Sequence, residues 1–368
     1  MRAEIQMQHI RNAITAYSGD VPLATYLKQF FREHKEMGSR DRRFYSSVIF
    51  TYFRLKGNRP HNERIIVDAA QKTDDAEVFF AYWDPRMEKV EKDGQHFFPV
   101  QDSISAALDV PMLLQAMEKR PCTWIRCSAG RKKEVIAAFQ KAGLVFEVHG
   151  NAISMDMHYP LQEMELFADG AFEIQDIASQ QVVELCKPKK NESWWDCCAG
   201  SGGKSLLLLE EEKQILLFVS DNRDSILRNL QERFLRHDVV NYNTVPLDIE
   251  TANEKQWNRI PVFDHILADV PCSGSGTWAR TPEWLHFFTK EKLEYYVRKQ
   301  RKIIQNIVPK VQTGGTIIYI TCSVYTDENE GNISWMEQNL SVKCMEKKYF
   351  AYADRGGDIL FGAVLQKK

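Results

Sequence analysis

The C-terminal half of the sequence alternates β-rich runs with helical patterns, and this alternation limits the fold more than any other feature. Helical patterns occupy Ser225–Arg236 and Lys290–Val311. Strands alternating with helices form a parallel, doubly wound α/β sheet, in which ligands bind at the carboxyl ends of the strands. The expected strands are Ser193–Cys197, Ile215–Ser220, Tyr242–Pro246, His265–Ala268 and Thr316–Thr321.

The remaining sequence divides into two parts, since 368 residues exceed one ordinary core. From His9 to about Asp93, apolar residues recur at helical spacing, with a capped helix start at Ser39-Arg40-Asp41 and a stop at Gly57-Asn58-Arg59-Pro60. From about Phe97 to Asp169 the pattern is that of a small α+β module of ferredoxin-like type. Its expected elements are a strand at Thr123–Cys127, a helix at Arg131–Ala142, and a hairpin of Leu144–Val148 and Ala152–Met155 around Gly150-Asn151. We therefore predict domains at residues 1–95, 96–170 and 171–368.

Composition places the chain among ordinary globular proteins, with 44% hydrophobic and 27% charged residues. No run approaches the roughly 18 apolar residues that span a bilayer, and the start lacks the apolar core of a signal peptide. We expect a cytoplasmic monomer that does not bind membranes. Eight cysteines without a C-x-x-C pair predict free thiols and no metal site.

The net charge of −2 hides a basic N-terminal part, because residues 1–60 contain 11 Lys and Arg against 5 Asp and Glu. The basic residues cluster around one predicted helix: Arg40, Arg42, Arg43, Arg54, Lys56 and Arg59. Arg42, Arg43 and Arg54 are the candidates for contacts to nucleic-acid phosphates, since Lys and Arg neutralise phosphates. The alternative is a solvated helix face that touches no nucleic acid.

A glycine-rich turn follows the first strand of the predicted sheet. It reads D-C-C-A-G-S-G-G-K-S from Asp196, and such a turn lets backbone N–H groups approach a ligand. The Walker pattern fails because Cys198 stands where its first glycine belongs, and the dinucleotide pattern fails at Ser205. A tight strand–helix connection without a ligand is the alternative.

Two acidic residues follow the next strands. Asp221 ends the second strand and can accept both ribose hydroxyls of a nucleoside, although aspartate is also a common helix N-cap. Asp248 follows the third strand. A glycine turn with two such acids and no phosphate-binding pattern favours S-adenosylmethionine over NAD.

The fourth and fifth strands each end beside a cysteine. Strand four leads into A-D-V-P-C-S-G-S-G, with Asp269 and Cys272, and strand five into T-C-S, with Cys322. Neighbouring strands lie about 4.8 Å apart, so both thiols should reach the edge that faces the glycine turn. The alternative is a pair of buried small side chains, since free cysteine is often buried.

A thiol overcomes one chemical difficulty in methylating a pyrimidine. Carbon 5 of cytosine is too weak a nucleophile to attack a sulfonium methyl group, and thiolate addition at carbon 6 activates it. A free thiol has a pKa of about 8.5, so the site must favour its ionised form. Asp269 could offset charge at N3 of the base.

These motifs together resemble the RsmB/Nop/Sun family of RNA cytosine-5 methyltransferases. The resemblance extends over about 174–368 and includes R-T-P-E from Arg280 and T-C-S-V-Y-T-D-E-N-E from Thr321. The middle module resembles the family's RNA-binding linker domain, and the first helices resemble its NusB-like domain. The implied fold is therefore α/β, with a Rossmann-like methyltransferase sheet preceded by a helical and a small α+β domain.

The resemblance also implies roles for individual residues. Cys322 would attack carbon 6, and Cys272 would assist release of the product. Arg280 would contact RNA. The S-adenosylmethionine site would comprise Cys198, Ala199, Gly200, Ser201, Gly202, Gly203, Lys204, Asp221, Asp248 and Asp269.

The chain departs from the family where Gly200 and Ser201 replace an alanine and a proline of the turn, which puts cofactor affinity in question. Ile226 also replaces the basic residue usual after the second-strand acid. The RsmB-like organisation favours ribosomal over transfer RNA. A ribosome-assembly factor that binds RNA with weak or no catalysis is the alternative function.

Overall fold

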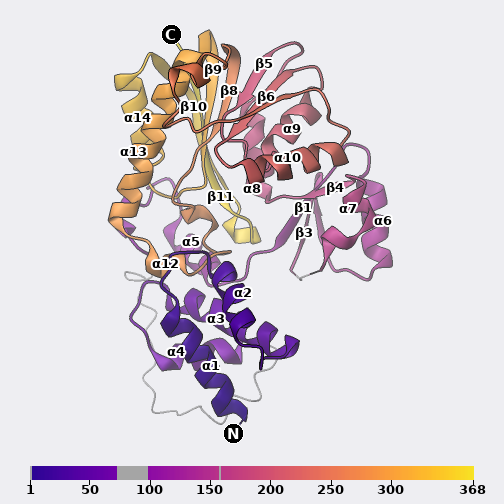
Figure 1. Cartoon of the computed structure of the whole chain (residues 1–368), viewed down its shortest axis with the longest axis vertical. Coiled ribbons are helices and arrows are strands. Elements are labelled where there is room, and N and C mark those ends of the chain that lie inside the picture. The colour runs from indigo at the N-terminus through magenta and orange to yellow at the C-terminus, as the bar shows by residue number, and fades with distance from the viewer. Residues whose placement is uncertain (1, 73–97, 157–158) are drawn as a thin grey trace. The chain divides into compact units, whose positions relative to one another are not determined.

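The computed structural model describes residues 2–72, 98–156 and 159–368 (Figure 1). The chain forms two compact units, each made from several stretches of sequence. The N-terminal unit comprises Met1–Ile104, Asp109–Arg120 and Thr277–Lys290, and the larger unit comprises Ser105–Leu108, Pro121–Gly276 and Glu291–Lys368. The predicted boundary between residues 95 and 96 lies outside the described residues.

The N-terminal unit is helical, as predicted. Helix α3 begins at Ser39 with Gly38 as its N-cap, so Ser39 starts the helix rather than capping it, and the helix ends before Gly57, whose φ is 53°. Apolar side chains such as Leu27, Val48 and Ile66 form one buried core. The predicted helical pattern from Thr73 to Asp93 lies outside the described residues. The helices are α1 (Arg2–Ala16), α2 (Leu23–Glu33), α3 (Ser39–Lys56), α4 (Glu63–Gln71), α5 (Val110–Met117) and α12 (Trp284–Phe287).

The larger unit contains a small antiparallel sheet with the order β2-β3-β1-β4. The succession βαββαβ with this strand order is ferredoxin-like, as predicted. β4 pairs with β1, so this sheet extends past the predicted boundary at residue 170. Its elements are β1 (Thr123–Cys127), α6 (Lys132–Lys141), β2 (Glu147–His149), β3 (Ala152–Met155), α7 (Glu165–Ala168) and β4 (Phe172–Ile174).

The main sheet of this unit has seven strands in the order β10-β11-β9-β8-β5-β6-β7. The five strands predicted for the parallel sheet are all present and parallel to one another. β11 pairs antiparallel with both β9 and β10, which the alternating pattern did not predict. The strands are β5 (Ser193–Asp196), β6 (Leu216–Asp221), β7 (Asn243–Pro246), β8 (Phe263–Asp269), β9 (Val311–Thr321), β10 (Val342–Ala351) and β11 (Ile359–Lys367).

Helices cover both faces of the main sheet, which makes it doubly wound as predicted (Figure 1). Neighbouring strand residues point to opposite faces: Trp195 packs in the core that contains α13 and α14, whereas Trp194 packs in the core that contains α8 to α10. α13 ends at Ile307 rather than extending to Val311, because Pro309 lacks the N–H that would continue the helix. The helices are α8 (Ile177–Gln181), α9 (Gly203–Glu211), α10 (Asp224–Arg236), α11 (Glu254–Trp257), α13 (Lys290–Ile307) and α14 (Glu330–Asn339).

In the described part of the chain, no helix has the length and apolar composition to cross a membrane.

Candidate active site

A cavity of about 630 Å³ opens at the carboxyl ends of the parallel strands. The residues after β5, β6, β7, β8 and β9 line it, as expected for an open α/β sheet. Of the predicted cofactor and catalytic residues, only Gly202 is absent from the lining. The predicted residues that line the cavity are Cys198, Ala199, Gly200, Ser201, Gly203, Lys204, Asp221, Asp248, Asp269, Cys272 and Cys322.

The glycine turn after β5 depends on two left-handed residues, since Gly200 has φ 53° and Gly202 has φ 82°. Gly202 also packs closely against α10: a Cβ there would lie 2.7 Å from Leu230 Cγ. Gly202 therefore shapes the turn from behind the cavity. The Gly200 N–H donates to Asp221 Oδ2 over 3.0 Å, which joins the turn to the end of β6.

Arg233 of α10 fixes the residue that replaces the family's proline. Its Nη1 donates to the Ser201 carbonyl oxygen over 2.7 Å and to the Ser201 hydroxyl over 2.9 Å. Glu173 of β4 holds Arg233 through an Nε–Oε2 contact of 3.0 Å. Sequence reasoning missed Arg233, because no local pattern links α10 to the turn.

Asp221 is buried at the end of β6, and Arg223 contacts both of its carboxylate oxygens. Burial opposes ionisation, but the hydrogen bonds and charge of Arg223 outweigh it and lower the pKa of Asp221. The carboxylate therefore remains an acceptor. Because Gly200 and Arg223 already donate to it, a ribose diol can bind there only if the exposed Arg223 side chain moves away.

A second carboxyl group, Asp196, lies buried at the end of β5 and lines the same cavity. Ser205 donates to its Oδ2 over 2.6 Å. Burial raises the pKa of Asp196 to about 7. Asp196 marked the strand end in the sequence but was not predicted as a site residue.

Lys204, at the start of α9, brings a positive charge to the cysteines. Its Nζ lies 2.6 Å from Asp269 Oδ2. Burial opposes the charge of Lys204, but Asp269 and, to a smaller extent, Cys322 outweigh burial and raise the pKa of Lys204. The sequence did not reveal this pairing of Lys204 with Asp269.

The two predicted cysteines meet at the cavity, with 3.2 Å between their sulfur atoms. The Cys322 N–H also donates to Cys272 Sγ over 3.3 Å. The hydrogen bond to Cys322, then burial and nearby negative charge, raise the pKa of Cys272 well above its ordinary value. Cys272 therefore remains a protonated thiol that can donate to Cys322.

Glu328 holds the turns that contain both cysteines. Its Oε1 accepts the Ser273 N–H over 2.9 Å and Gln300 Nε2 over 2.8 Å, while Oε2 accepts from the Ser273 and Ser323 hydroxyls. Burial raises the pKa of Glu328 despite these hydrogen bonds. The T-D-E-N-E run contained this residue, but only the fold shows that it joins Ser273 to Ser323.

The predicted RNA-binding arginines differ in accessibility. Arg43 is exposed, whereas Arg42 and Arg280 are half-buried. Arg54 does not fit the prediction, because its side chain is buried and donates to the Ala279 carbonyl oxygen over 2.9 Å. Burial, with the neighbouring charge of Arg120, lowers the pKa of Arg54 to about 10. Arg54 is a structural residue.

The segment Thr277–Lys290, which was predicted to belong to the third domain, packs in the N-terminal unit. Glu283 Oε1 accepts the Leu23 N–H over 3.0 Å, and Phe287 lies so close to Gly19 that a Cβ there would clash. The R-T-P-E motif therefore belongs to the helical core.

Comparisons with known proteins agree with this geometry. Residues 183–353 match the model of the family described as 16S rRNA methyltransferase RsmB/F. The chain is similar to ribosomal RNA small subunit methyltransferase B of Proteus mirabilis, with 26% identity over 70% of this chain and 61% of that relative. It spans only about 60% of the length of such relatives.

Two solved structures share the fold. The crystal structure of PH0851 covers 98% of both chains with a TM-score of 0.74 and 18% identity. That of NSun6 from Pyrococcus horikoshii with SFG covers 70% of this chain and 94% of that chain, with a TM-score of 0.62 and 18% identity. Residues 183–353, the part of the chain that matches the family model, contain every predicted cofactor and catalytic residue.

Proposed function

We propose that this protein transfers a methyl group from S-adenosylmethionine to carbon 5 of a cytosine in ribosomal RNA, through a covalent adduct between Cys322 and carbon 6. The observation that supports this most strongly is the 3.2 Å approach of Cys272 and Cys322 beside the Lys204 ammonium group, at the edge of the predicted cofactor cavity. The names of the relatives support ribosomal RNA as the substrate.

The cavity suits a nucleoside without phosphate groups. Each of its four lysine and arginine residues is already paired with a carboxylate: Lys204 with Asp269, Arg223 with Asp221, Arg233 with Glu173, and Lys299 with Glu250. A pyrophosphate would therefore find no unpaired cation among the lining residues, which disfavours NAD. The SFG in the NSun6 structure, an analogue of S-adenosylmethionine, is consistent with this choice.

Asp221 would hold the ribose, and the backbone of the glycine turn would surround the rest of the cofactor. When bound, S-adenosylmethionine supplies a methyl group on a sulfonium centre. Asp248, which lines the cavity beyond β7, would accept from the adenine side of the ligand. In these roles the carboxylates of Asp221 and Asp248 would accept hydrogen bonds from the ribose and the adenine of the cofactor.

The protein's own contribution to the reaction is nucleophilic and proton-transfer chemistry. The Cys322 thiolate adds to carbon 6 and makes carbon 5 nucleophilic. After carbon 5 has gained the methyl group, it gives up its proton to water, and the electron pair of that bond expels the Cys322 thiolate. Cys272 would assist this release by donating a hydrogen bond to the departing Cys322 sulfur. The target cytosine must be unstacked for attack on its face, which favours loops over an intact duplex.

Single cysteine variants test the proposal. Cys322→Ala should neither methylate RNA nor form a covalent complex, whereas Cys272→Ala should accumulate a protein–RNA adduct on a denaturing gel with RNA and cofactor. Cys344→Ser, which changes a cysteine outside the cavity, is the control and should behave as wild type. An adduct in Cys322→Ala alone would reverse the assignment of roles.

The alternative, an RNA-binding assembly factor without catalysis, predicts a different outcome. It requires wild-type protein to bind RNA but to leave no methyl group and no adduct. Bisulfite sequencing of total RNA with and without the gene distinguishes the two functions and identifies the modified cytosine.

A further inference from the structure

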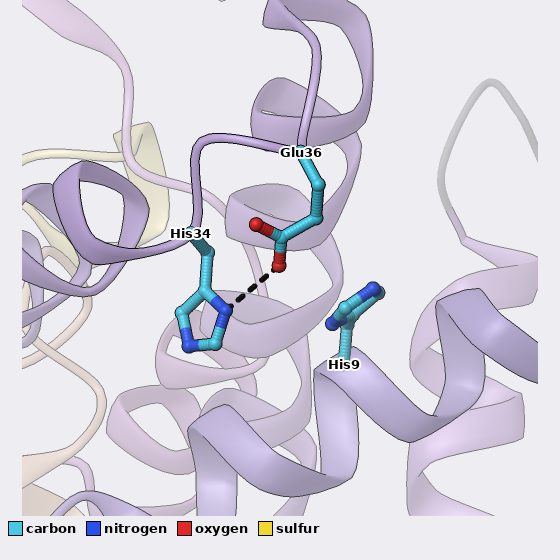
Figure 2. A group of neighbouring side chains, drawn as sticks. All are labelled: His9, His34 and Glu36. Atoms are coloured by element: carbon cyan, nitrogen blue, oxygen red, sulfur yellow. Dashed lines mark hydrogen bonds and ion pairs between the residues drawn. The ribbon is translucent and has the colours of Figure 1, made fainter.

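Two histidines and a glutamate of the N-terminal unit bring their side chains together (Figure 2). His9 lies on α1, His34 directly follows α2, and Glu36 lies in the turn that leads to α3. One possible ligand atom from each lies within 4.8 Å of the others, and His34 Nδ1 is 2.9 Å from Glu36 Oε1. We propose that His9, His34 and Glu36 bind a zinc ion that joins α1 to the α2–α3 turn.

The donor set suits zinc. Zinc takes imidazole nitrogens and carboxylate oxygens at about 2.0 to 2.2 Å, so neighbouring ligand atoms of a tetrahedral ion lie about 3.3 Å apart. His34 Nδ1 and Glu36 Oε1 are 2.9 Å apart in a hydrogen bond, and the ion would take the place of the proton between them, which would be released to water. Each imidazole would donate the lone pair of an unprotonated nitrogen, and water would complete the coordination. Three nitrogen and oxygen ligands of this type select zinc over magnesium, which prefers oxygen ligands in octahedral geometry.

The backbone of the turn fixes the two ligands that it contributes. The His34 N–H donates to the Phe30 carbonyl oxygen over 3.1 Å, and the Met37 N–H donates to the His34 carbonyl oxygen over 3.3 Å. Arg42 Nε donates to the Met37 carbonyl oxygen over 2.9 Å. The backbone of the turn is therefore held before any ion binds, which reduces the ordering that binding would require.

Aromatic side chains restrict the two imidazole rings. The ring centroids of His34 and Phe30 are 4.3 Å apart, and those of His9 and Tyr45 are 5.9 Å apart. Phe30 and Tyr45 are themselves buried in the helical core. Both histidines thus lie near aromatic side chains, while Glu36 is exposed to solvent.

Glu36 would bring a carboxylate, and hence a negative charge, to the ion. The expectation of no metal was based on cysteine spacing. That criterion cannot detect a site whose histidines are far apart in sequence and are brought together by folding.

Thermal unfolding of the full chain with and without zinc tests the proposal. Zinc at about 100 times its dissociation constant should raise Tm by about 5 °C, because an ion that binds only the folded state stabilises it. Titration calorimetry should give one ion per chain. His9→Asn and Glu36→Gln should each remove the shift while the metal-free Tm stays close to that of the wild type. The control Glu33→Gln changes a nearby exposed carboxylate, which bonds only Gln29 in this region, and should keep the full zinc shift.

Three results would overturn the proposal: no zinc binding to the wild type, an undiminished shift in His9→Asn, or an equal loss of the shift in Glu33→Gln. Magnesium at the same concentration should give no shift, and an equal effect of magnesium would indicate general charge screening instead. The cluster lies outside residues 183–353, so these results are independent of the proposed methyl transfer.

Discussion

Arg233 donates from a single nitrogen to both the carbonyl and the hydroxyl oxygen of Ser201, 32 residues earlier in the chain. Ser201 stands where related turns have a proline, whose ring would limit the backbone. In this protein, hydrogen bonds from Arg233 of α10 limit the backbone of the turn instead. The turn is therefore stabilised by a tertiary contact rather than by its own sequence.

Removal of this contact should weaken cofactor binding. Arg233→Met should raise the Kd for S-adenosylmethionine about tenfold, equivalent to about 1.4 kcal/mol, with kcat at saturating cofactor little changed. Calorimetry measures the Kd, and single-turnover methylation measures the rate at saturating cofactor. Arg236→Met is the matched control, because Arg236 also contacts Glu173 but has no hydrogen bond to Ser201. An equal effect of both variants would assign the effect to Glu173.

Replacement of Arg223 should have the opposite effect on affinity. Arg223→Gln removes the guanidinium that occupies both oxygens of Asp221, and the Kd for the cofactor should fall several-fold. Asp221→Ala should raise it sharply. Arg228→Gln, an exposed site on α10 with the same loss of charge, serves as control. Weaker binding by Arg223→Gln would mean that the arginine itself contacts the ligand.

Glu328→Gln should slow catalysis without weakening cofactor binding. An amide cannot accept all the hydrogen bonds from Ser273, Ser323 and Gln300 that the carboxylate accepts. The two turns that contain the cysteines should therefore shift relative to each other. We expect kcat to fall by about 100-fold, as for catalytic groups displaced by about 1 Å. Glu330→Gln, at a nearby acidic position, should have a much smaller effect. A rise in the cofactor Kd equal to the loss of kcat would argue for general disruption.

The salt dependence of RNA binding should depend on exposed arginines only. Each phosphate contact to a single strand contributes about 0.7 to the slope of log K against log salt, so Arg40→Glu with Arg43→Glu should reduce the slope by about 1.4. Arg54→Met should leave the slope unchanged and lower Tm, because Arg54 is buried against Ala279. Filter binding at several salt concentrations measures the slopes. An unchanged slope in the double variant would mean that α3 does not contact RNA through these arginines and has only a structural role.

Glu173 should make the protein sensitive to acid. Burial alone would raise its pKa, but the hydrogen bond from His237 and the charges of Arg233 and Arg236 lower it to about 2. Since the unfolded value is near 4.5, the folded state binds this proton less readily, and the stabilisation is lost as pH falls from 4.5 to 2. The unfolding free energy of wild type should fall more steeply over this range than that of Glu173→Gln. Parallel pH profiles would contradict the assignment.

The meeting of the two cysteines could be predicted from the sequence because it follows from topology. Parallel strands end at one edge, so Cys272 and Cys322 had to be neighbours once β8 and β9 were identified as adjacent strands. Side chains that act across the fold were not predictable in this way. Nothing local to Arg233 or Glu328 indicates its partner, and the burial of Arg54 depends on a segment more than 200 residues later in the chain. A charged residue is expected to be exposed, but a hydrogen-bond partner from a distant segment can allow it to be buried, as for Arg54.

The packing of Thr277–Lys290 in the N-terminal unit has a consequence during synthesis. The helices up to Arg120 leave the ribosome long before the segment that completes their core. At roughly 5 to 20 residues per second, translation from there to Lys290 takes about 10 to 35 s. For that time Leu23, Gly19 and Arg54 lack their native neighbours Glu283, Phe287 and Ala279. The first unit to be made therefore cannot finish folding until most of the second has been translated.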